Sequence, residues 1–417
     1  MTQLTPASAH AGGAVSTLVA TFMVQACAAA GFIAMSLLAP NLADATGLNE
    51  RDFGLSVSFF FVGTALSSPF SGALVRALGS VAALVAAMIF MALAFLICLW
   101  GSWTAVMLAA LLFGMGYGPS GPIGMTLVTR RTPPGRRGLF LSLRQAAQPL
   151  AAAVGGRALP PLMAVAGWQA GVYATSAMLA CGAIVVLLAA PLFRIERNEV
   201  PIAPQRHHAL SRTISGIIGY LVVPRDLRLL WGAGLVFAIT QVAMMIFSYL
   251  YLLEVVGLSA IAAGIFISNQ QIAGMVGRPV LGWICDVTGR SQSVLGAIAL
   301  FAVATIAALS FASADMPFWQ LSLLAAATGI AGQTWNSVFT TAMSYRLAPE
   351  QLVEMNGRAF SFLSFGWMAA APLFWALIEL SGGYALPFAI IMLANAIVGV
   401  VLLLYSDKSD RVYPEMR

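Results

Sequence analysis

The stretch Gly282-Trp-Ile-Cys-Asp-Val-Thr-Gly289-Arg290 combines two glycines with the charged residues Asp286 and Arg290, and it lies between two long apolar runs that we expect to be helices. A similar loop, Gly72-Ala-Leu-Val-Arg-Ala-Leu-Gly79, lies 210 residues earlier in the chain. Arg131, which precedes two prolines, and Arg346, which precedes Pro349, repeat at a spacing of 215 residues. Two halves with the same order of loops predict a fold built from two related bundles.

The composition places these loops in a membrane protein. Hydrophobic residues make up 60% of the 417 residues and charged residues 9%, whereas soluble domains carry about 25% charged residues. A membrane-spanning helix needs about 20 mostly apolar residues. We therefore predict an all-α membrane protein of twelve transmembrane helices, in two six-helix bundles related by a pseudo-twofold axis. The expected spans are residues 15–40, 53–76, 80–100, 103–129, 138–163, 169–193, 229–253, 258–282, 292–312, 317–343, 354–379 and 384–405.

The longest polar interruption divides the two halves. It contains three prolines and two histidines, as expected for a linker. We expect an N-terminal tail at 1–14, a first bundle at 15–193, a linker at 194–228, a second bundle at 229–405 and a C-terminal tail at 406–417. Within the linker, Leu210–Val223 could form a short interfacial helix.

Basic residues predict the orientation. The chain has 21 Lys and Arg against 15 Asp and Glu, and a net charge of +6. With a cytoplasmic N-terminus, most of the basic residues fall in cytoplasmic segments, as the positive-inside rule requires. We expect a multi-pass protein of the bacterial inner membrane with both termini in the cytoplasm. The first 14 residues lack Lys, Arg and a cleavage pattern, so we expect no signal peptide.

Several function classes find no support in the sequence. The four cysteines lack metal-ligand or disulfide spacing, and no histidine cluster, nucleophile elbow or phosphate-binding loop occurs. We therefore expect no enzyme, no metal and no cofactor. The basic balance is explained by the loops, so we expect no nucleic-acid partner. The expected partners are a small anionic substrate and membrane lipid. We expect the protein itself to be a monomer.

The 282–290 loop resembles the G-x-x-x-D-x-x-G-R loop of the major facilitator superfamily, with Gly282, Asp286, Gly289 and Arg290 at the matching positions. Gly277-Arg278-Pro279 and Gly167-Trp168 fit the same resemblance, which covers nearly the whole chain. It implies a transporter in which this loop holds the cytoplasmic side shut in one state. By that resemblance these four residues would act in gating, although a solvated turn is the alternative.

The first copy of the loop departs from the pattern. Arg76 stands where the aspartate is expected. The start of the eleventh expected helix, its partner by resemblance, carries Glu350 and Glu354. We hypothesise that Arg76 pairs with one of these glutamates and preserves the gate with swapped charges. An exposed, unpaired Arg76 is the alternative.

Two arginines lie inside the fifth expected span, whereas we read no Asp, Glu or His in the middle of any span. A charge at the bilayer centre costs roughly 2.5–3.5 kcal/mol, so these arginines suggest a pathway for anions. Arg144 and Gln148 are four residues apart and should share a helix face. Arg144 could instead bend toward the interface. Arg157 lies about 20 Å further along the helix, and a role in binding and a structural role stay equally open for it.

Neutral polar residues extend this set. In the superfamily, the first, fourth, seventh and tenth helices line the cavity, and the eighth expected helix carries a run of amides. By resemblance the further substrate-binding candidates are Gln25, Tyr117, Gln241, Gln333, Trp335 and Asn336. Asn269 is added from the run of amides, of which only one or two can face the cavity. Each could instead make a hydrogen bond between helices.

We predict a secondary active transporter that moves a small organic anion, most simply a carboxylate, by alternating access. The coupling would be anion exchange or co-transport of substrate and proton, and facilitated diffusion is a third scheme. Because we read no central acid that could carry a proton, a co-transported proton would neutralise the substrate carboxylate itself. The alternative within transport is an exporter of neutral solutes or drugs. From another class, the alternative is a membrane sensor or scaffold that does not transport.

Overall fold

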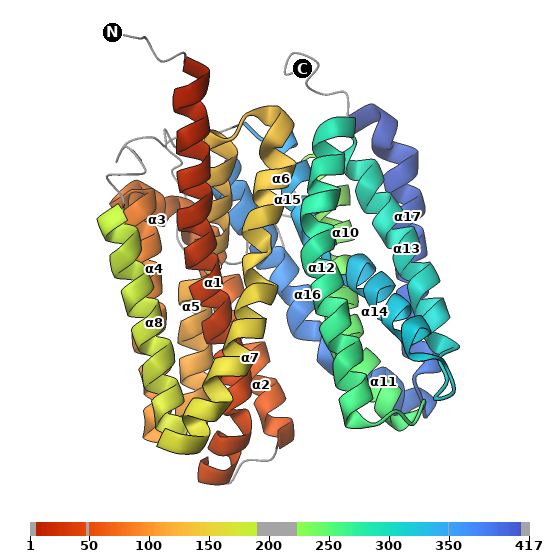
Figure 1. The fold of residues 1–417 in the computed structure, drawn as a ribbon. Helices are drawn as coiled ribbons and strands as arrows, with labels where there is room; N and C mark the ends of the chain where they lie inside the picture. The colour runs from red at the N-terminus through yellow and green to blue at the C-terminus, as the bar shows by residue number, and fades with distance from the viewer. Residues whose placement is uncertain (1–5, 47–49, 190–222, 349, 410–417) are drawn as a thin grey trace. The chain divides into compact units, whose positions relative to one another are not determined.

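A computed structural model describes residues 6–46, 50–189, 223–348 and 350–409. These residues form helices and turns, which confirms the predicted all-α class. The possible interfacial helix at 210–223 lies almost wholly outside the described residues. The α-helices, coloured along the chain in Figure 1, are α1 Pro6–Thr46, α2 Glu50–Ser67, α3 Ser71–Leu78, α4 Ser80–Leu96, α5 Trp103–Arg131, α6 Arg137–Gln145, α7 Ala147–Ala166, α8 Trp168–Ala189, α10 Arg225–Val242, α11 Ser248–Glu254, α12 Ala260–Thr288, α13 Ser291–Ser310, α14 Phe318–Gln333, α15 Trp335–Arg346, α16 Leu352–Ser381 and α17 Ala385–Ser409.

Two compact units divide the chain. Unit 1 comprises Met1–Pro133, Leu143–Val222 and Leu347–Phe365, and unit 2 comprises Pro134–Ser142, Val223–Arg346 and Gly366–Arg417. Each unit thus takes one short segment from the other half of the sequence. The start of α6 belongs to unit 2, and the start of α16 belongs to unit 1.

Four expected spans are interrupted in the structure. The expected helix at 53–76 divides into α2 and α3 around a 3-10 helix, Ser68–Phe70. The expected helix at 138–163 divides into α6 and α7 at Ala146, because Pro149 has no N–H for the Gln145 carbonyl and its ring crowds that oxygen. The expected helix at 317–343 divides into α14 and α15 at Thr334. A five-residue π-helix, Ala243–Phe247, lies between α10 and α11. Such local departures from α-helix are frequent at functional sites.

Nine helical segments of the described chain are long and apolar enough to cross a membrane. The other three expected spans fall on α6 with α7, on α12, and on α14 with α15. These segments are interrupted or carry buried polar side chains such as Arg144, Gln270 and Arg278. Both fully or nearly fully buried arginines, Arg144 and Arg278, therefore lie in these less apolar segments.

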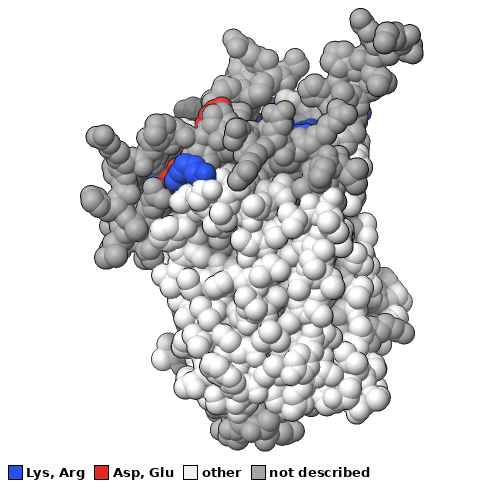
Figure 2. Space-filling model, turned by 90° about the vertical axis from the view of Figure 1, so that its left-hand side faces the viewer, with Lys and Arg blue, Asp and Glu red and all other residues white. Residues whose placement is uncertain are grey.

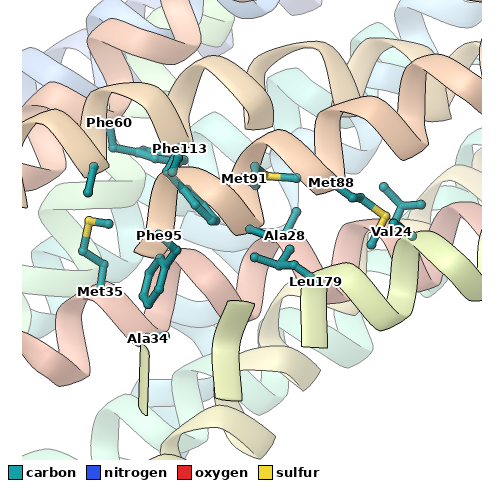
Figure 3. Packing of buried hydrophobic residues seen from close by; sticks show 14 of the residues in the cluster. Val24, Ala28, Ala34, Met35, Phe60, Met88, Met91, Phe95, Phe113 and Leu179 are labelled. Atoms are coloured by element: carbon teal, nitrogen blue, oxygen red, sulfur yellow. The ribbon is translucent and has the colours of Figure 1, made fainter. Parts of the chain in front are cut away.

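Each unit has its own apolar core. In unit 1, Phe60, Phe95 and Phe113 pack with Met88 and Met91, as Figure 3 shows. In unit 2, aromatic residues of the π-helix, α11, α16 and α17 pack together, with the ring centroids of Phe247 and Phe374 4.4 Å apart.

Apolar side chains also cover outward surfaces. On the face seen in Figure 2, the described Lys, Arg, Asp and Glu gather near one end, and the surface below them carries none among its described residues. Leu93 and Leu188 are 60% and 72% exposed. An exposed face of this kind suits lipid rather than water, and the protein is an integral, multi-pass membrane protein.

Candidate functional site

Arg144 lies in the last turn of α6, and its side chain is completely buried in unit 1. Its Nη2 donates to the Gln25 Oε1 on α1 at 2.9 Å and to the Ser120 carbonyl on α5 at 3.4 Å. Its Nε and Nη1 have no hydrogen-bond partner among the described residues. Because Nε carries one N–H and Nη1 carries two, three buried donors are left to bind a further group.

A chain of hydrogen bonds extends from this guanidinium. Arginine can only donate, so its bond to Gln25 fixes Oε1 of that amide toward Arg144. The Gln25 Nε2 then donates to the Tyr117 hydroxyl oxygen at 3.1 Å, and the Gln148 Nε2 donates to the same oxygen at 3.1 Å. We call these four residues the Arg144 network. The Tyr117 hydroxyl oxygen accepts two N–H groups of this network, so the Tyr117 O–H can donate to a further group.

A glycine makes room for the guanidinium. A Cβ on Gly124 of α5 would lie 2.5 Å from the Arg144 Nη2 and 2.8 Å from its Nε. The guanidinium therefore lies against the bare backbone of α5, and any larger residue would displace it. The break between α6 and α7 follows two residues later, so the buried arginine sits directly before the interruption that Pro149 imposes.

No carboxylate of the described chain pairs with Arg144. A charge taken out of water costs several kcal/mol unless it is paired, and here the described partners are neutral. An interfacial position does not fit, because the side chain is 0% exposed. Arg157 lies in α7, but its side chain is outside what the structure describes.

A second polar cluster lies in unit 2. The Trp367 indole N–H on α16 donates to the Gln241 Oε1 on α10 at 3.1 Å, and the Gln241 Nε2 donates to the Gln333 Oε1 on α14 at 2.8 Å. The Gln333 Nε2 is buried without a partner among the described residues. We call these three residues the Gln333 network.

Arg278 holds the helix break beside this network. It is 2% exposed, and its Nε donates to the Gln333 carbonyl at 3.0 Å. That carbonyl would otherwise accept from Ser337 N–H, which bonds to the Thr334 carbonyl instead. The cation thus satisfies the carbonyl end of α14, where the helix dipole is negative.

Trp335 follows the break and is 1% exposed. Its ring stacks on Phe237 at 5.6 Å, with 12° between the planes, and lies 6.2 Å from Trp367. Its Nε1 has no hydrogen-bond partner among the described residues. Of the other candidates, Asn336 is 5% exposed, and Asn269 donates to the Ser322 hydroxyl on α14 at 3.2 Å.

The expected gating aspartate caps α6. Both Asp286 carboxylate oxygens accept from backbone N–H groups, Gly138 at 2.7 Å and Leu139 at 2.9 Å, and Tyr345 donates its hydroxyl at 2.8 Å. Burial raises the pKa of Asp286, although these hydrogen bonds and Arg137 act in the opposite direction. Gly282 lies close to Gly138, where a Cβ on either would meet the other's backbone. Asp286 therefore neutralises the positive end of α6.

Other gating candidates are placed differently. Gly289 ends α12 with φ +65°, a conformation that favours glycine, and Arg290 is exposed. Glu354 pairs with Arg358 at 2.6 Å. Arg76 is exposed, and both its guanidinium and Glu354 lie near Gly72. The hypothesised Arg76–Glu354 ion pair is not formed among the described residues.

Comparison with known proteins decides the family. The sequence profile of the Major Facilitator Superfamily matches residues 21–346 and 270–416. This chain belongs to the major facilitator superfamily. Two uncharacterized MFS-type transporters of Mycobacterium tuberculosis are 28% identical over 295 residues (strain CDC 1551 / Oshkosh) and 29% identical over 285 residues (strain ATCC 25618 / H37Rv). Each match covers 66% of this chain but 61% and 59% of the relatives, so the chain spans about three fifths of their length.

Solved superfamily structures share the fold. FucP in its outward conformation has a TM-score of 0.69 at 17% identity, covering 95% of this chain and 99% of FucP. The human organic anion transporter MFSD10 has 0.69 at 15%, covering 93% and 99%. The proton:xylose symporter XylE has 0.68 at 13%, covering 96% and 96%. At identities this low, the structural similarity shows the fold alone. It confirms the predicted fold of twelve helices in two bundles.

Three buried or network residues of unit 2 are not among the candidates that the sequence offers. Arg278 lies within the expected span 258–282, so its position in an apolar run is a signal that could have identified it as a buried arginine. Gln270, 0% exposed, donates to the Met244 carbonyl of the π-helix at 3.1 Å. Trp367 gave no local signal, because nothing in the sequence shows that α16 reaches Gln241.

Proposed function

We propose that this protein is a secondary transporter of a small organic anion, most simply a carboxylate, in a bacterial inner membrane with both termini cytoplasmic. The observation that carries the proposal is the buried Arg144 guanidinium, which has three N–H donors without partners among the described residues and no carboxylate to neutralise it. A bound anion would supply the missing charge and the missing acceptors at once.

The chemistry of the Arg144 network favours a carboxylate. Two oxygens can accept from Nε and Nη1 of the planar guanidinium, and the Tyr117 O–H adds a neutral donor. A cation would meet an unneutralised positive charge and be repelled. The solved superfamily members named above include sugar symporters and an organic anion transporter, so the choice of substrate rests on Arg144 and not on the fold.

A ligand-binding measurement tests the proposal directly. The purified protein would be heated in detergent with acetate, benzoate, succinate, a hexose or a cationic drug. We expect stabilisation by one or more carboxylates and not by the cation, and a ligand at 100 times its Kd should add about 2.7 kcal/mol. Stabilisation by the cation or the sugar alone would favour an exporter of neutral solutes or drugs.

Substitutions decide which arginine is responsible. The carboxylate effect should disappear in Arg144→Gln and persist in Arg225→Gln, which alters an exposed arginine that contacts Tyr405. Loss of the effect in Arg157→Gln, with Arg144→Gln unchanged, would show that Arg144 is not the anion-binding residue.

Transport and its coupling need a sealed membrane. In liposomes containing the protein, uptake of labelled carboxylate driven by internal unlabelled carboxylate would show exchange. Uptake driven by an inward proton gradient would show co-transport with a proton. Binding without either flux would support a sensor or scaffold instead.

A further inference from the structure

Two helices of unit 2 reach the edge of the membrane beside each other. The candidate membrane span Arg225–Glu254 begins at the first residue of α10, and the span Ala385–Tyr405 ends near the end of α17. The Arg225 Nη2 donates to the Tyr405 hydroxyl at 3.2 Å, and the Arg225 Cζ lies 5.1 Å from the centroid of the Tyr405 ring. Because each residue marks the end of a span and the two are in contact, both lie at one membrane–water boundary, where arginine and tyrosine side chains meet lipid headgroups.

Arg228 adds a second cation to this boundary. It follows Arg225 by three residues, and side chains at that spacing are neighbours on a helix surface. The Arg228 Nε is buried without a hydrogen-bond partner, and neither arginine pairs with a carboxylate of the described residues. One face of α10 therefore carries two guanidinium groups whose N–H donors can bind an acceptor that the described residues do not supply.

Asp226 does not neutralise this face. It lies in the first turn of α10 and is exposed. It follows Arg225 by one residue, so it points about 100° away around the helix. It forms no ion pair with a described arginine, and at the start of a helix its carboxylate is stabilised by the helix dipole. The face that carries Arg225 and Arg228 thus stays positive and attracts anions.

An apolar stripe on α17 leads up to the two arginines. Leu393, Ile397, Val400 and Leu404 follow one another at spacings of four, three and four residues, so they share one face of the helix. Their side chains are 49–73% exposed, and the stripe ends one residue before Tyr405. A soluble anion gains nothing from such a surface, whereas a phospholipid brings both a phosphate and acyl chains that cover it.

We propose that Arg225 and Arg228 bind the phosphate of an anionic phospholipid, with its acyl chains along the α17 stripe. Guanidinium groups form strong charge-assisted hydrogen bonds with phosphate oxygens, two from each group in the best geometry. Tyr405 is a positioning residue, because its ring holds the Arg225 guanidinium at the boundary. The site is argued from unit 2 alone and does not depend on the anion proposed for Arg144.

Native mass spectrometry of the full-length protein, stripped of copurified lipid in detergent, tests the site. Dioleoyl phosphatidylglycerol and dioleoyl phosphatidylcholine share their acyl chains and a phosphate, but only the first has a net negative charge. We expect the wild-type protein to bind phosphatidylglycerol about tenfold more tightly, as two arginines near the headgroup predict. Equal binding of the two lipids would overturn the proposal without any substitution.

A soluble headgroup separates lipid from free phosphate. Glycerol 3-phosphate offers the same acceptor oxygens without acyl chains, so a large excess of it should leave phosphatidylglycerol bound. If glycerol 3-phosphate binds as tightly as phosphatidylglycerol does, the arginines recognise a soluble phosphate and the lipid site is wrong.

Substitutions then identify the binding residues. Arg225→Gln and Arg228→Gln should each weaken phosphatidylglycerol binding about tenfold, because each removes charge-assisted hydrogen bonds to the phosphate. The matched control is Arg136→Gln, which makes the same change of charge at an exposed arginine of the segment Pro134–Arg136. An equal loss in Arg136→Gln, or an unchanged preference for phosphatidylglycerol in the Arg225→Gln/Arg228→Gln double variant, would refute the site.

Tyr405 and Arg144 complete the test. Tyr405→Leu should weaken phosphatidylglycerol binding, whereas Tyr405→Phe, which keeps the ring, should retain most of it; wild-type binding in Tyr405→Leu would remove Tyr405 from the site. Arg225→Gln should lose the lipid and keep carboxylate binding, and Arg144→Gln should do the reverse. Loss of phosphatidylglycerol in Arg144→Gln, with binding kept in Arg225→Gln, would place the lipid phosphate at the Arg144 network and overturn the proposal.

Discussion

Replacing Arg144 by glutamine should abolish anion binding without weakening the fold. The substitution removes one good hydrogen bond, 2.9 Å to Gln25, and one long bond, 3.4 Å to the Ser120 carbonyl. Together these contribute about 2–4 kcal/mol at most. It also removes a fully buried charge that no described carboxylate neutralises, a burden of several kcal/mol. The two effects nearly cancel, so the ligand-free variant should be as stable as the wild type or slightly more so.

The loss of binding should be much larger than the change in stability. An anion that accepts from Nε and Nη1 gains two charge-assisted bonds of about 1.5–3 kcal/mol each, so the Kd should rise at least 100-fold. Melting temperatures with and without carboxylate measure both quantities in one experiment, with Arg225→Gln as the control. A ligand-free variant destabilised by about 3–5 kcal/mol, as expected when a structural buried ion pair is broken, would show that Arg144 holds the fold together and would refute the argument.

Three further predictions follow from single contacts. Gly124→Ala should move the Arg144 guanidinium and weaken carboxylate binding about tenfold. The control Gly121→Ala on the same helix should leave binding unchanged, because a Cβ there would meet only Met125 at 3.8 Å. Equal effects of the two substitutions would mean that Gly124 does not position Arg144. Because burial raises the pKa of Asp286, the folded state binds this proton more tightly than the unfolded chain does. The stability contributed by Asp286 should therefore fall as pH rises from about 4 through the raised pKa. The slope of melting temperature against pH should flatten in Asp286→Asn and not in the control Asp315→Asn, and an identical slope in the wild type and Asp286→Asn would contradict this. Gln270→Leu should leave the Met244 carbonyl without its side-chain donor and cost about 1–3 kcal/mol, whereas Gln271→Leu on the next residue should cost less; the free energy of unfolding of the two variants decides.

Much of the fold could be predicted from sequence, because hydrophobic length and loop repeats depend on the chain alone. The interruptions of the helices are harder to predict from sequence. The break at Ala146 is set by Pro149 and could have been expected from the proline rule. The break at Thr334 depends on Arg278, which lies 55 residues away in sequence and reaches Gln333 only through tertiary packing.

The candidate site was predictable by residue type but not by partner. Arg144 and Gln148 stand out as polar groups in an apolar run, and the structure brings them together with Gln25 and Tyr117. Their connection across α1, α5, α6 and α7 follows from packing. The donor pattern of the Gln333 network depends on Trp367, whose contribution is visible only when α10, α14 and α16 are seen together.

The exchange of short segments between the units has a consequence for how the chain can be divided. A cut in the region between α8 and α10 would produce two fragments, each of which corresponds to one predicted six-helix half of the sequence. The first fragment would lack Leu347–Phe365 of unit 1, and the second would lack Pro134–Ser142 of unit 2. Each fragment therefore lacks a segment of the unit that it mostly encodes. The two fragments should accumulate as folded protein only when they are synthesised in the same cell.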